Sequence, residues 1–139
     1  MITIEQGHLG LIMEAGYIYI GMSRFKEARK VFDGLSVLAP ASELPLISLG
    51  NVFFCEGKFQ LAIKEYNKAL KMNPESDFAH AYLGEVLFFM KKKEEAIKEL
   101  KKAKEIAPKG KAAIFADSLL AAIKNGFTPA MVAGVTDKE

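Results

Sequence analysis

The cysteine and histidine side chains, which commonly act in nucleophilic, acid–base or metal chemistry, are few in this 139-residue sequence: His8, Cys55 and His80. A nucleophilic cysteine needs a nearby histidine base, and a metal site needs several ligands at characteristic spacings. No cysteine–histidine motif surrounds Cys55, and the two histidines are far apart in the sequence. The sequence also contains no P-loop, dinucleotide-binding glycine pattern, HExxH motif or EF-hand loop. We therefore predict no enzymatic activity, no cofactor and no metal.

The composition is that of a folded domain. Hydrophobic residues make up 50% of the chain, enough to build a core, and the length fits one domain. The net charge of +2 is too small to indicate nucleic acid as the main partner. Cys55 has no second cysteine with which to pair, so the fold needs no oxidising compartment.

The N-terminal sequence resembles neither an export signal nor a membrane anchor. Residues 1–8 lack the cationic region with which a signal peptide begins. The apolar stretch from Leu9 to Met22 includes Glu14 and is shorter than the ~20 residues that span a bilayer. We therefore predict a cytoplasmic protein with no membrane span.

Three residue types recur along the chain at a constant interval of 34 residues. Internal repeats of this length are typical of stacked helical units. In the middle unit, apolar residues follow the i, i+3, i+4, i+7 spacing of a helix in two segments, which Gly57-Lys58 separates. Three independent markers that keep one period twice in succession indicate a true repeat. The markers are Gly16, Gly50 and Gly84; Ala28, Ala62 and Ala96; and Pro40, Pro74 and Pro108.

Each marker suits one position in a pair of packed helices. A glycine midway along the first helix costs roughly 1 kcal/mol against alanine, so its repetition implies close packing there. The alanine lies early in the second helix, and we expect Gly50 and Ala62 to meet at the tightest crossing of the central pair. The proline follows the second helix and ends it, because proline has no N–H and a fixed φ.

The markers and the apolar positions between them resemble the tetratricopeptide repeat (TPR) pattern. That pattern is a large residue, Leu-Gly, an aromatic residue, then Ala, an aromatic residue, Ala and Pro. The resemblance covers about residues 9–110. The first repeat departs from the pattern at Ala15 and Leu35, and the third has leucines at both aromatic positions. The middle repeat follows it with Leu46, Leu49, Gly50, Phe53, Ala62, Tyr66, Ala69 and Pro74.

The resemblance implies an all-α fold: a right-handed superhelix of three TPR helix pairs and a C-terminal capping helix. The expected divisions are a lead-in (1–8), three repeats over 9–110 (9–42, 43–76 and 77–110), a capping helix (111–126) and a tail (127–139). The tail is apolar but lacks helical periodicity, so it frays, folds back over the repeats or orders on binding. The expected helices lie near 9–22, 25–38, 43–56, 59–72, 77–90, 93–106 and 111–125.

In TPR proteins the first helix of each repeat lines a concave groove, and repeat positions 2, 5, 9 and 12 usually contact the ligand. These positions are mostly apolar here, with Asn51 and Glu85 as polar exceptions. Such a groove favours an apolar helix or an extended apolar segment of another protein. We expect Phe54 and Phe88 to face an open groove. The predicted partner-binding residues are Met13, Tyr17, Ile20, Leu44, Ile47, Asn51, Phe54, Phe78, Glu85 and Phe88.

TPR co-chaperones that bind the carboxylate tail of heat-shock chaperones do so with lysine, arginine and asparagine at clamp positions. None of the residues at the corresponding positions of this sequence is cationic, so we predict that the carboxylate clamp is absent. The clamp positions hold Met13, Tyr17, Ser48, Phe78 and Tyr82.

Some features of the sequence have alternative interpretations. The first helices are apolar nearly all round, which fits a bound partner, a self-contact in a homodimer or heteromer, or core packing. The segment from Lys91 to Lys111 has nine lysines against four glutamates. It fits a solvated convex face with pairs such as Glu94–Lys98, or else a docking patch for an acidic partner or a membrane. We expect His80 in the core or at its boundary, and Cys55 buried or half-buried.

By size, repeat number and groove character, the sequence resembles the small bacterial TPR chaperones of type III secretion. These chaperones hold hydrophobic translocator or needle subunits soluble in the cytoplasm before export. The resemblance implies a non-enzymatic module that shields an apolar segment of a secreted partner in its concave groove. The alternative is a general TPR adaptor that assembles a multiprotein complex. Neither interpretation involves nucleic acid.

Overall fold

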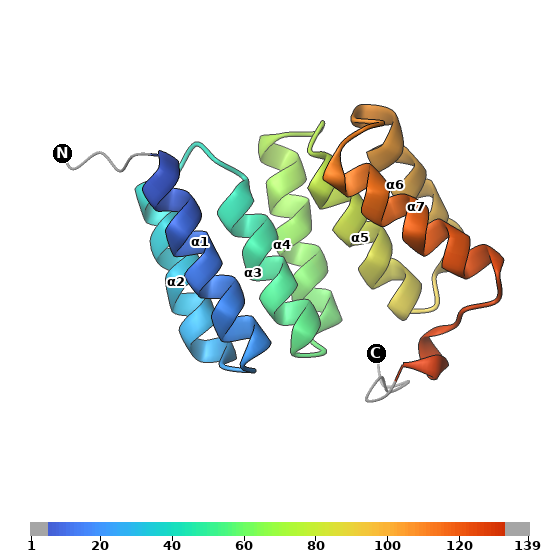
Figure 1. Ribbon diagram of the computed structural model, residues 1–139, viewed down its shortest axis with the longest axis horizontal. Coiled ribbons are helices and arrows are strands. Elements are labelled where there is room, and N and C mark those ends of the chain that lie inside the picture. The colour runs from blue at the N-terminus through green and yellow to red at the C-terminus, as the bar shows by residue number, and fades with distance from the viewer. Residues whose placement is uncertain (1–5, 133–139) are drawn as a thin grey trace.

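The structure is a computed structural model, which describes residues 6–132 and shows an all-α fold (Figure 1). The described part contains seven α-helices, one short 3₁₀ helix and no β-strand, as predicted. Most helix ends fall within one residue of the predicted ends, but the first helix begins earlier, at Gln6, inside the expected lead-in. The helices are α1 (Gln6–Gly21), α2 (Phe25–Leu38), α3 (Leu44–Cys55), α4 (Phe59–Met72), α5 (Asp77–Phe89), α6 (Lys93–Ile106) and α7 (Lys111–Lys124), followed by η1 (Pro129–Met131).

Consecutive helices pair, and the pairs stack in chain order into a superhelix. α1 packs on α2, α3 on α4 and α5 on α6, while α2–α3 and α4–α5 contacts join successive pairs (Figure 1). The first helices also touch one another along the stack, α1 against α3 and α3 against α5. Burial between neighbouring units therefore stabilises the array, as expected for a solenoid.

The repeated glycines allow a large side chain to pack directly against the first helix of each pair. A Cβ atom at Gly16 would collide with the ring of Phe32, and one at Gly50 would collide with the ring of Tyr66. The expected contact of Gly50 with Ala62 is therefore not the nearest one at this crossing. Ala62 is fully buried, but the side chain lying over Gly50 is Tyr66, one turn further along α4.

The turns inside the three pairs share one backbone feature. Ser23, Gly57 and Lys91 all have a positive φ, of 58°, 77° and 65° respectively. A non-glycine residue pays a steric cost in this left-handed region, and only the middle repeat avoids it by using glycine. The turns of the first and third repeats, which look atypical in sequence, therefore adopt the same local geometry as the second.

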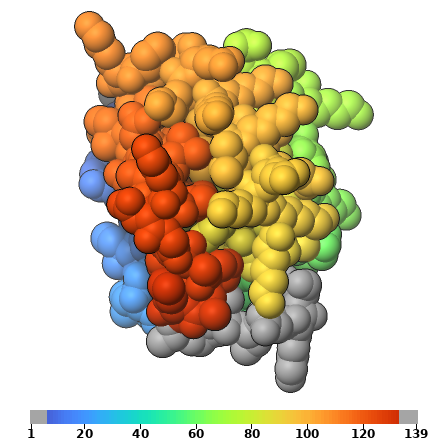
Figure 2. Space-filling view, turned by 90° about the vertical axis from the view of Figure 1, so that its right-hand side faces the viewer, coloured from blue at the N-terminus to red at the C-terminus, as the bar shows by residue number. Residues whose placement is uncertain are grey.

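The two ends of the stack are covered to different degrees. α7 packs on α5 and α6, buries Ala112, Ala113 and Ala116, and thus caps the third pair as predicted. At the other end, Leu11 and Ile18 on α1 are each 62% exposed. Figure 2 shows the capped end, where the red side chains of α7 lie beside the orange and yellow ones of α6.

The segment after α7 folds back toward the third repeat. Gly126 ends the helix with φ 92°, and the ring of Phe127 then stacks on Phe88, with 5.6 Å between ring centroids. η1 follows at Pro129–Met131. Of the three alternatives for the tail, folding back applies to residues 127–132, while residues 133–139 lie outside the described part.

The lysine-rich helix α6 keeps most of its charges in solvent. Lys98, Lys101 and Lys102 are exposed. Within residues 6–132 the expected Glu94–Lys98 ion pair does not form, whereas Lys104 pairs with Asp117 of α7 at 2.6 Å. This ion pair adds to the packing between α6 and α7, although a pair this exposed contributes little to stability.

Candidate functional site

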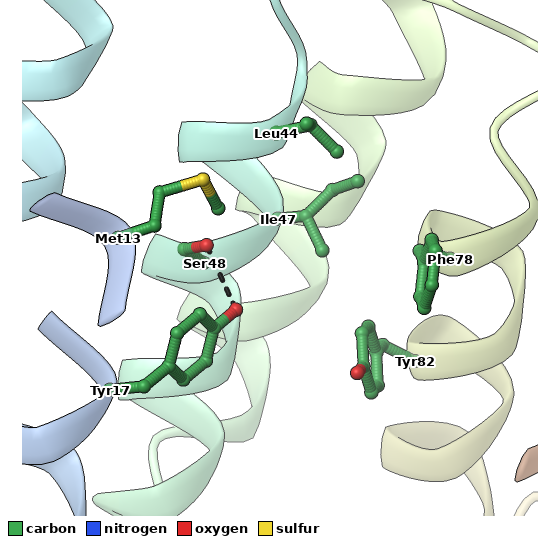
Figure 3. Close-up of a pocket in the computed structure, with 7 residues that line it drawn as sticks. All are labelled: Met13, Tyr17, Leu44, Ile47, Ser48, Phe78 and Tyr82. Carbon is green, nitrogen blue, oxygen red and sulfur yellow. Dashed lines mark hydrogen bonds between the residues drawn. The ribbon is translucent and has the colours of Figure 1, made fainter. Parts of the chain in front are cut away.

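An apolar cavity opens on the concave side, between the first helices of the three repeats. Its volume is about 250 Å³, enough for one or two amino-acid side chains. α1, α3 and α5 each contribute residues to its wall, and these side chains face a common space in Figure 3. The lining residues are Met13, Tyr17, Leu44, Ile47, Ser48, Phe78 and Tyr82.

Helical periodicity explains why these residues share one wall. On α3, Leu44, Ile47 and Ser48 are spaced i, i+3, i+4 and therefore lie on the same face. Each neighbouring helix contributes two lining residues spaced i, i+4. These are Met13 and Tyr17 on α1, and Phe78 and Tyr82 on α5. The rings of Phe78 and Tyr82 stack with centroids 6.1 Å apart. The cavity therefore has an aromatic wall from α5, a largely aliphatic wall from α3, and a mixed wall of Met13 and Tyr17 from α1.

The structure brings together half of the residues predicted for the groove. Met13, Tyr17, Leu44, Ile47 and Phe78 all line the cavity. Ser48 and Tyr82 also line it, although the four usual contact positions of the repeat omit them. Their position in the sequence does carry a signal, because both occupy clamp positions of the TPR pattern. The cavity thus contains every clamp position, with no cation at any of them.

A row of polar groups borders the cavity. Tyr66 donates a hydrogen bond to Oδ1 of Asn51 at 2.6 Å, and Nδ2 of Asn51 donates to the Tyr17 hydroxyl at 3.0 Å. The hydroxyls of Tyr17 and Ser48 are 2.9 Å apart (Figure 3). These bonds cross from α4 to α3 to α1, so they hold the first two repeats in a fixed relation. Burial of Tyr66 raises the pKa of its hydroxyl, which keeps that group a neutral donor.

Glu85 on α5 occupies the same repeat position as Tyr17 and Asn51. Burial raises the pKa of its carboxyl group to about 7. Its charge acts on groups from neighbouring helices, because it helps to raise the pKa of Cys55 on α3 and of Tyr66 on α4. Glu85 therefore lies on the concave side, close to the polar row, although it does not line the cavity.

Three predicted groove residues are placed differently by the structure. Phe88 is only 3% exposed, because Phe89 and Phe127 pack against its ring. Phe54 is partly buried between the rings of Phe59 and Phe89, with centroids 5.4 Å away in both cases. The expectation that Phe88 faces an open groove is therefore wrong, whereas Phe54, like Phe78, is partly exposed. Ile20 packs against the core of the first repeat and does not line the cavity.

The residues that first suggested chemistry form no reactive site. His80 is 5% exposed, and its ring nitrogens lie 2.6 Å from Glu99 and 2.9 Å from the Pro74 carbonyl, a structural role as predicted. Cys55 was expected to be buried or half-buried, but the residue as a whole is exposed. Burial of its thiol and the charge of Glu85 raise its pKa, so the thiolate needed for nucleophilic attack is disfavoured.

Residues 6–132 also lack two other kinds of feature. No group of histidine, cysteine, aspartate or glutamate side chains in this range is arranged to hold a metal ion. No helix in the same range has both the length and the apolar character that a membrane span needs.

Sequence comparison assigns the repeats to a known family. A family described as "TPR repeat" matches residues 50–91, and one described as "Tetratricopeptide repeat" matches residues 79–109. The chain is a tetratricopeptide repeat protein. Among curated proteins, no sequence matches this TPR protein significantly.

Solved structures share the fold of this TPR protein at low sequence identity. The type III secretion translocator chaperone SycD of Yersinia enterocolitica is 22% identical, with a TM-score of 0.71 over 87% of this chain and 95% of SycD. The first TPR of Spaghetti (RPAP3), bound to an HSP90 peptide, is 22% identical, with a TM-score of 0.68 over 90% and 97% of the two chains. PcrH in complex with the chaperone binding region of PopB is 16% identical, with a TM-score of 0.69 over 87% and 98%.

The geometry of this TPR protein suits the binding of apolar groups. The cavity presents carbon atoms and a few hydroxyls, and no nucleophile, base or metal ligand set faces it. An apolar group that enters the cavity leaves water, and that burial stabilises a complex by roughly 25 cal/mol per Å². The TPR fold makes the chain a protein-interaction module.

Proposed function

We propose that the protein holds an apolar segment of another protein in the cavity between α1, α3 and α5, and that it acts as a type III secretion chaperone. The observation that supports this most directly is the mostly apolar lining of the cavity, with no cation at any clamp position. At those positions a clamp for a carboxylate tail requires cations, which this chain lacks. An apolar side chain of a partner suits the cavity better than a charged terminus.

The chaperone role rests on groove character and on the similar structures together. A secreted subunit that later enters a membrane or polymerises carries an apolar segment that associates prematurely if left uncovered. A cavity of this kind covers one or two anchoring side chains of such a segment, and an interface depends mostly on a few such anchors. SycD, which also has a solved complex with a peptide of the translocator YopD, is a protein of this class. As such a chaperone, the protein would act in the cytoplasm.

The alternative is a general adaptor that brings together a multiprotein complex. The similarity to RPAP3 supports it as far as the fold goes. The bound HSP90 peptide SRMEEVD ends in acidic residues, however, whereas the cavity in this chain has no cation to receive them. An adaptor of this sequence would therefore also bind an apolar segment.

Co-purification with matched variants tests the proposal. Tagged protein is recovered from native extract as wild type, Phe78→Glu and Lys98→Glu, and bound proteins are identified by mass spectrometry. We expect wild type and Lys98→Glu to retain the same partner, because Lys98 lies exposed on α6. Phe78→Glu should lose that partner while keeping its helical circular dichroism spectrum.

The outcome of this experiment also separates the two roles. A secreted translocator or needle subunit as partner supports the chaperone, while stable components of a standing complex support the adaptor. Retention of the partner by a folded Phe78→Glu variant contradicts both, and directs attention to α6 or α7 instead.

A further inference from the structure

Glu85 is an acidic side chain on the concave side that has no counterion among residues 6–132. Its side chain is partly buried but still reaches solvent. No hydrogen bond or ion pair joins it to any other residue in the described range 6–132. Burial raises the pKa of its carboxyl group to about 7, so water and neighbouring dipoles stabilise the charged form poorly. A carboxylate in this state gains strongly from an external cation.

The helices that line the groove supply no such cation. α1, α3 and α5 contain no lysine or arginine at all, although the chain has 19 of these residues. Two of the three helices carry acidic residues, with Glu14 on α1 and Asp77 and Glu85 on α5. The concave side is therefore apolar with a negative bias, and its charge is complementary to a cationic group from outside.

The polar groups near Glu85 satisfy one another. Asn51 accepts from Tyr66 and donates to Tyr17, so its amide is engaged on both sides. Tyr66 and Tyr82 are neutral phenols, and burial keeps both so, raising the pKa of Tyr82 to about 12. Cys55, which also feels the charge of Glu85, is a neutral thiol. A partner that covers this region therefore finds one unsatisfied carboxylate beside satisfied neutral groups.

We infer that the bound segment carries a lysine or arginine side chain next to its apolar residues, and that this cation binds Glu85. The inference rests on the proposed function, because it names the chemistry of the partner at the same groove. A charge-assisted hydrogen bond in a partly buried setting offsets the desolvation of both groups. The apolar cavity then contributes most of the affinity for the segment, and Glu85 determines which apolar segments bind.

Glu85 selects among partner segments because binding a segment that lacks a cation at this place is energetically unfavourable. A wholly apolar segment would cover Glu85 and leave its carboxyl group without water or counterion, which is unfavourable. A segment with glutamate or aspartate at the same place would add charge repulsion. Glu85 therefore discriminates among apolar segments, a task that the cavity alone performs weakly.

The test uses an array of synthetic peptides of about twelve residues, composed of leucine, valine, alanine and serine. Each peptide is printed in versions that carry lysine, glutamine or glutamate at one position, and that position is moved along the peptide. The array is probed with wild type, Glu85→Gln and Glu14→Gln. Glu14 is the matched control, because it is an exposed carboxylate on a lining helix. Circular dichroism establishes that each variant is folded.

For wild type and Glu14→Gln, we expect lysine at the preferred position to bind about tenfold better than glutamine, and glutamate to bind worst. Glu85→Gln should bind the glutamine versions as well as wild type does, with the lysine preference reduced to within about twofold. An unchanged lysine preference in Glu85→Gln overturns the inference, because the cation then binds elsewhere. Apolar peptides that bind wild type without any lysine preference overturn it too, and leave the proposed function intact. Failure of every peptide to bind wild type contradicts both.

Discussion

Two parts of the concave side, at the two ends of the first helices, both carry large apolar residues but differ in how far aromatic rings fill the space between the helices. Around Phe78 and Leu44, near the beginnings of α5 and α3, the side chains surround a cavity. Around Phe54 and Phe88, near the ends of the same helices, aromatic rings fill the space instead. A repeat position therefore specifies which way a side chain points, while its neighbours decide whether it is accessible.

The largest expected effect comes from placing a charge in each part. Phe88→Glu should destabilise the protein by about 3–5 kcal/mol, because a buried ring with aromatic neighbours is replaced by a carboxylate without a partner. Phe78→Glu should cost only about 1 kcal/mol, because its side chain is partly exposed at the cavity. Urea unfolding monitored by circular dichroism measures both values. Equal destabilisation by the two substitutions would contradict the division into an open and a filled part.

A smaller effect on the free energy of unfolding is expected from the titration of Glu85. Its pKa is raised from 4.5 to about 7, so the folded state holds a proton that the unfolded state releases. Between these pH values the folded state binds more protons, and the free energy of unfolding therefore decreases as pH rises. The destabilisation is absent below about pH 4.5 and complete above about pH 7.

Glu85→Gln removes this titration. At pH 8 the variant should be about 1–3 kcal/mol more stable than wild type, a range that allows for the partial exposure of the side chain. At pH 4.5 the two proteins should differ little. Urea unfolding at both pH values measures the difference, with Glu14→Gln as the exposed control. A gain in stability that is the same at pH 4.5 and pH 8 would show that the charge of Glu85 is not its cause.

The fold follows from the sequence because its determinants are repeated. Gly16, Gly50 and Gly84 mark the helix crossings, and the prolines after α2, α4 and α6 mark the helix ends, so each repeat supports the interpretation of the others. The repeat spacing predicts which helices meet at Gly50, but not that the nearest side chain to the glycine is that of Tyr66. That contact depends on how far Tyr66 reaches.

The site was predictable only where the repeat pattern alone determines it. Met13, Tyr17, Leu44, Ile47 and Phe78 line the cavity because each lies on the inner face of a first helix. Phe88 fails because Phe127, which covers it, belongs to a non-repeated segment. The packing of Phe59 and Phe89 around Phe54 likewise depends on residues outside the contact positions of the repeat. Aromatic residues at the ends of helices and after α7 are the signal in the sequence that indicates this filling.

The central claim is that the open part of the groove receives an apolar segment, and methyl NMR tests it most directly. Protein with labelled isoleucine, leucine and methionine methyl groups is titrated with the array peptide that binds best. The account predicts that the methyl signals of Met13, Leu44 and Ile47 shift, while those of Ile97 on α6 and Ile114 on α7 stay in place. Shifts confined to Ile97 or Ile114, with the cavity methyl groups unchanged, would contradict it.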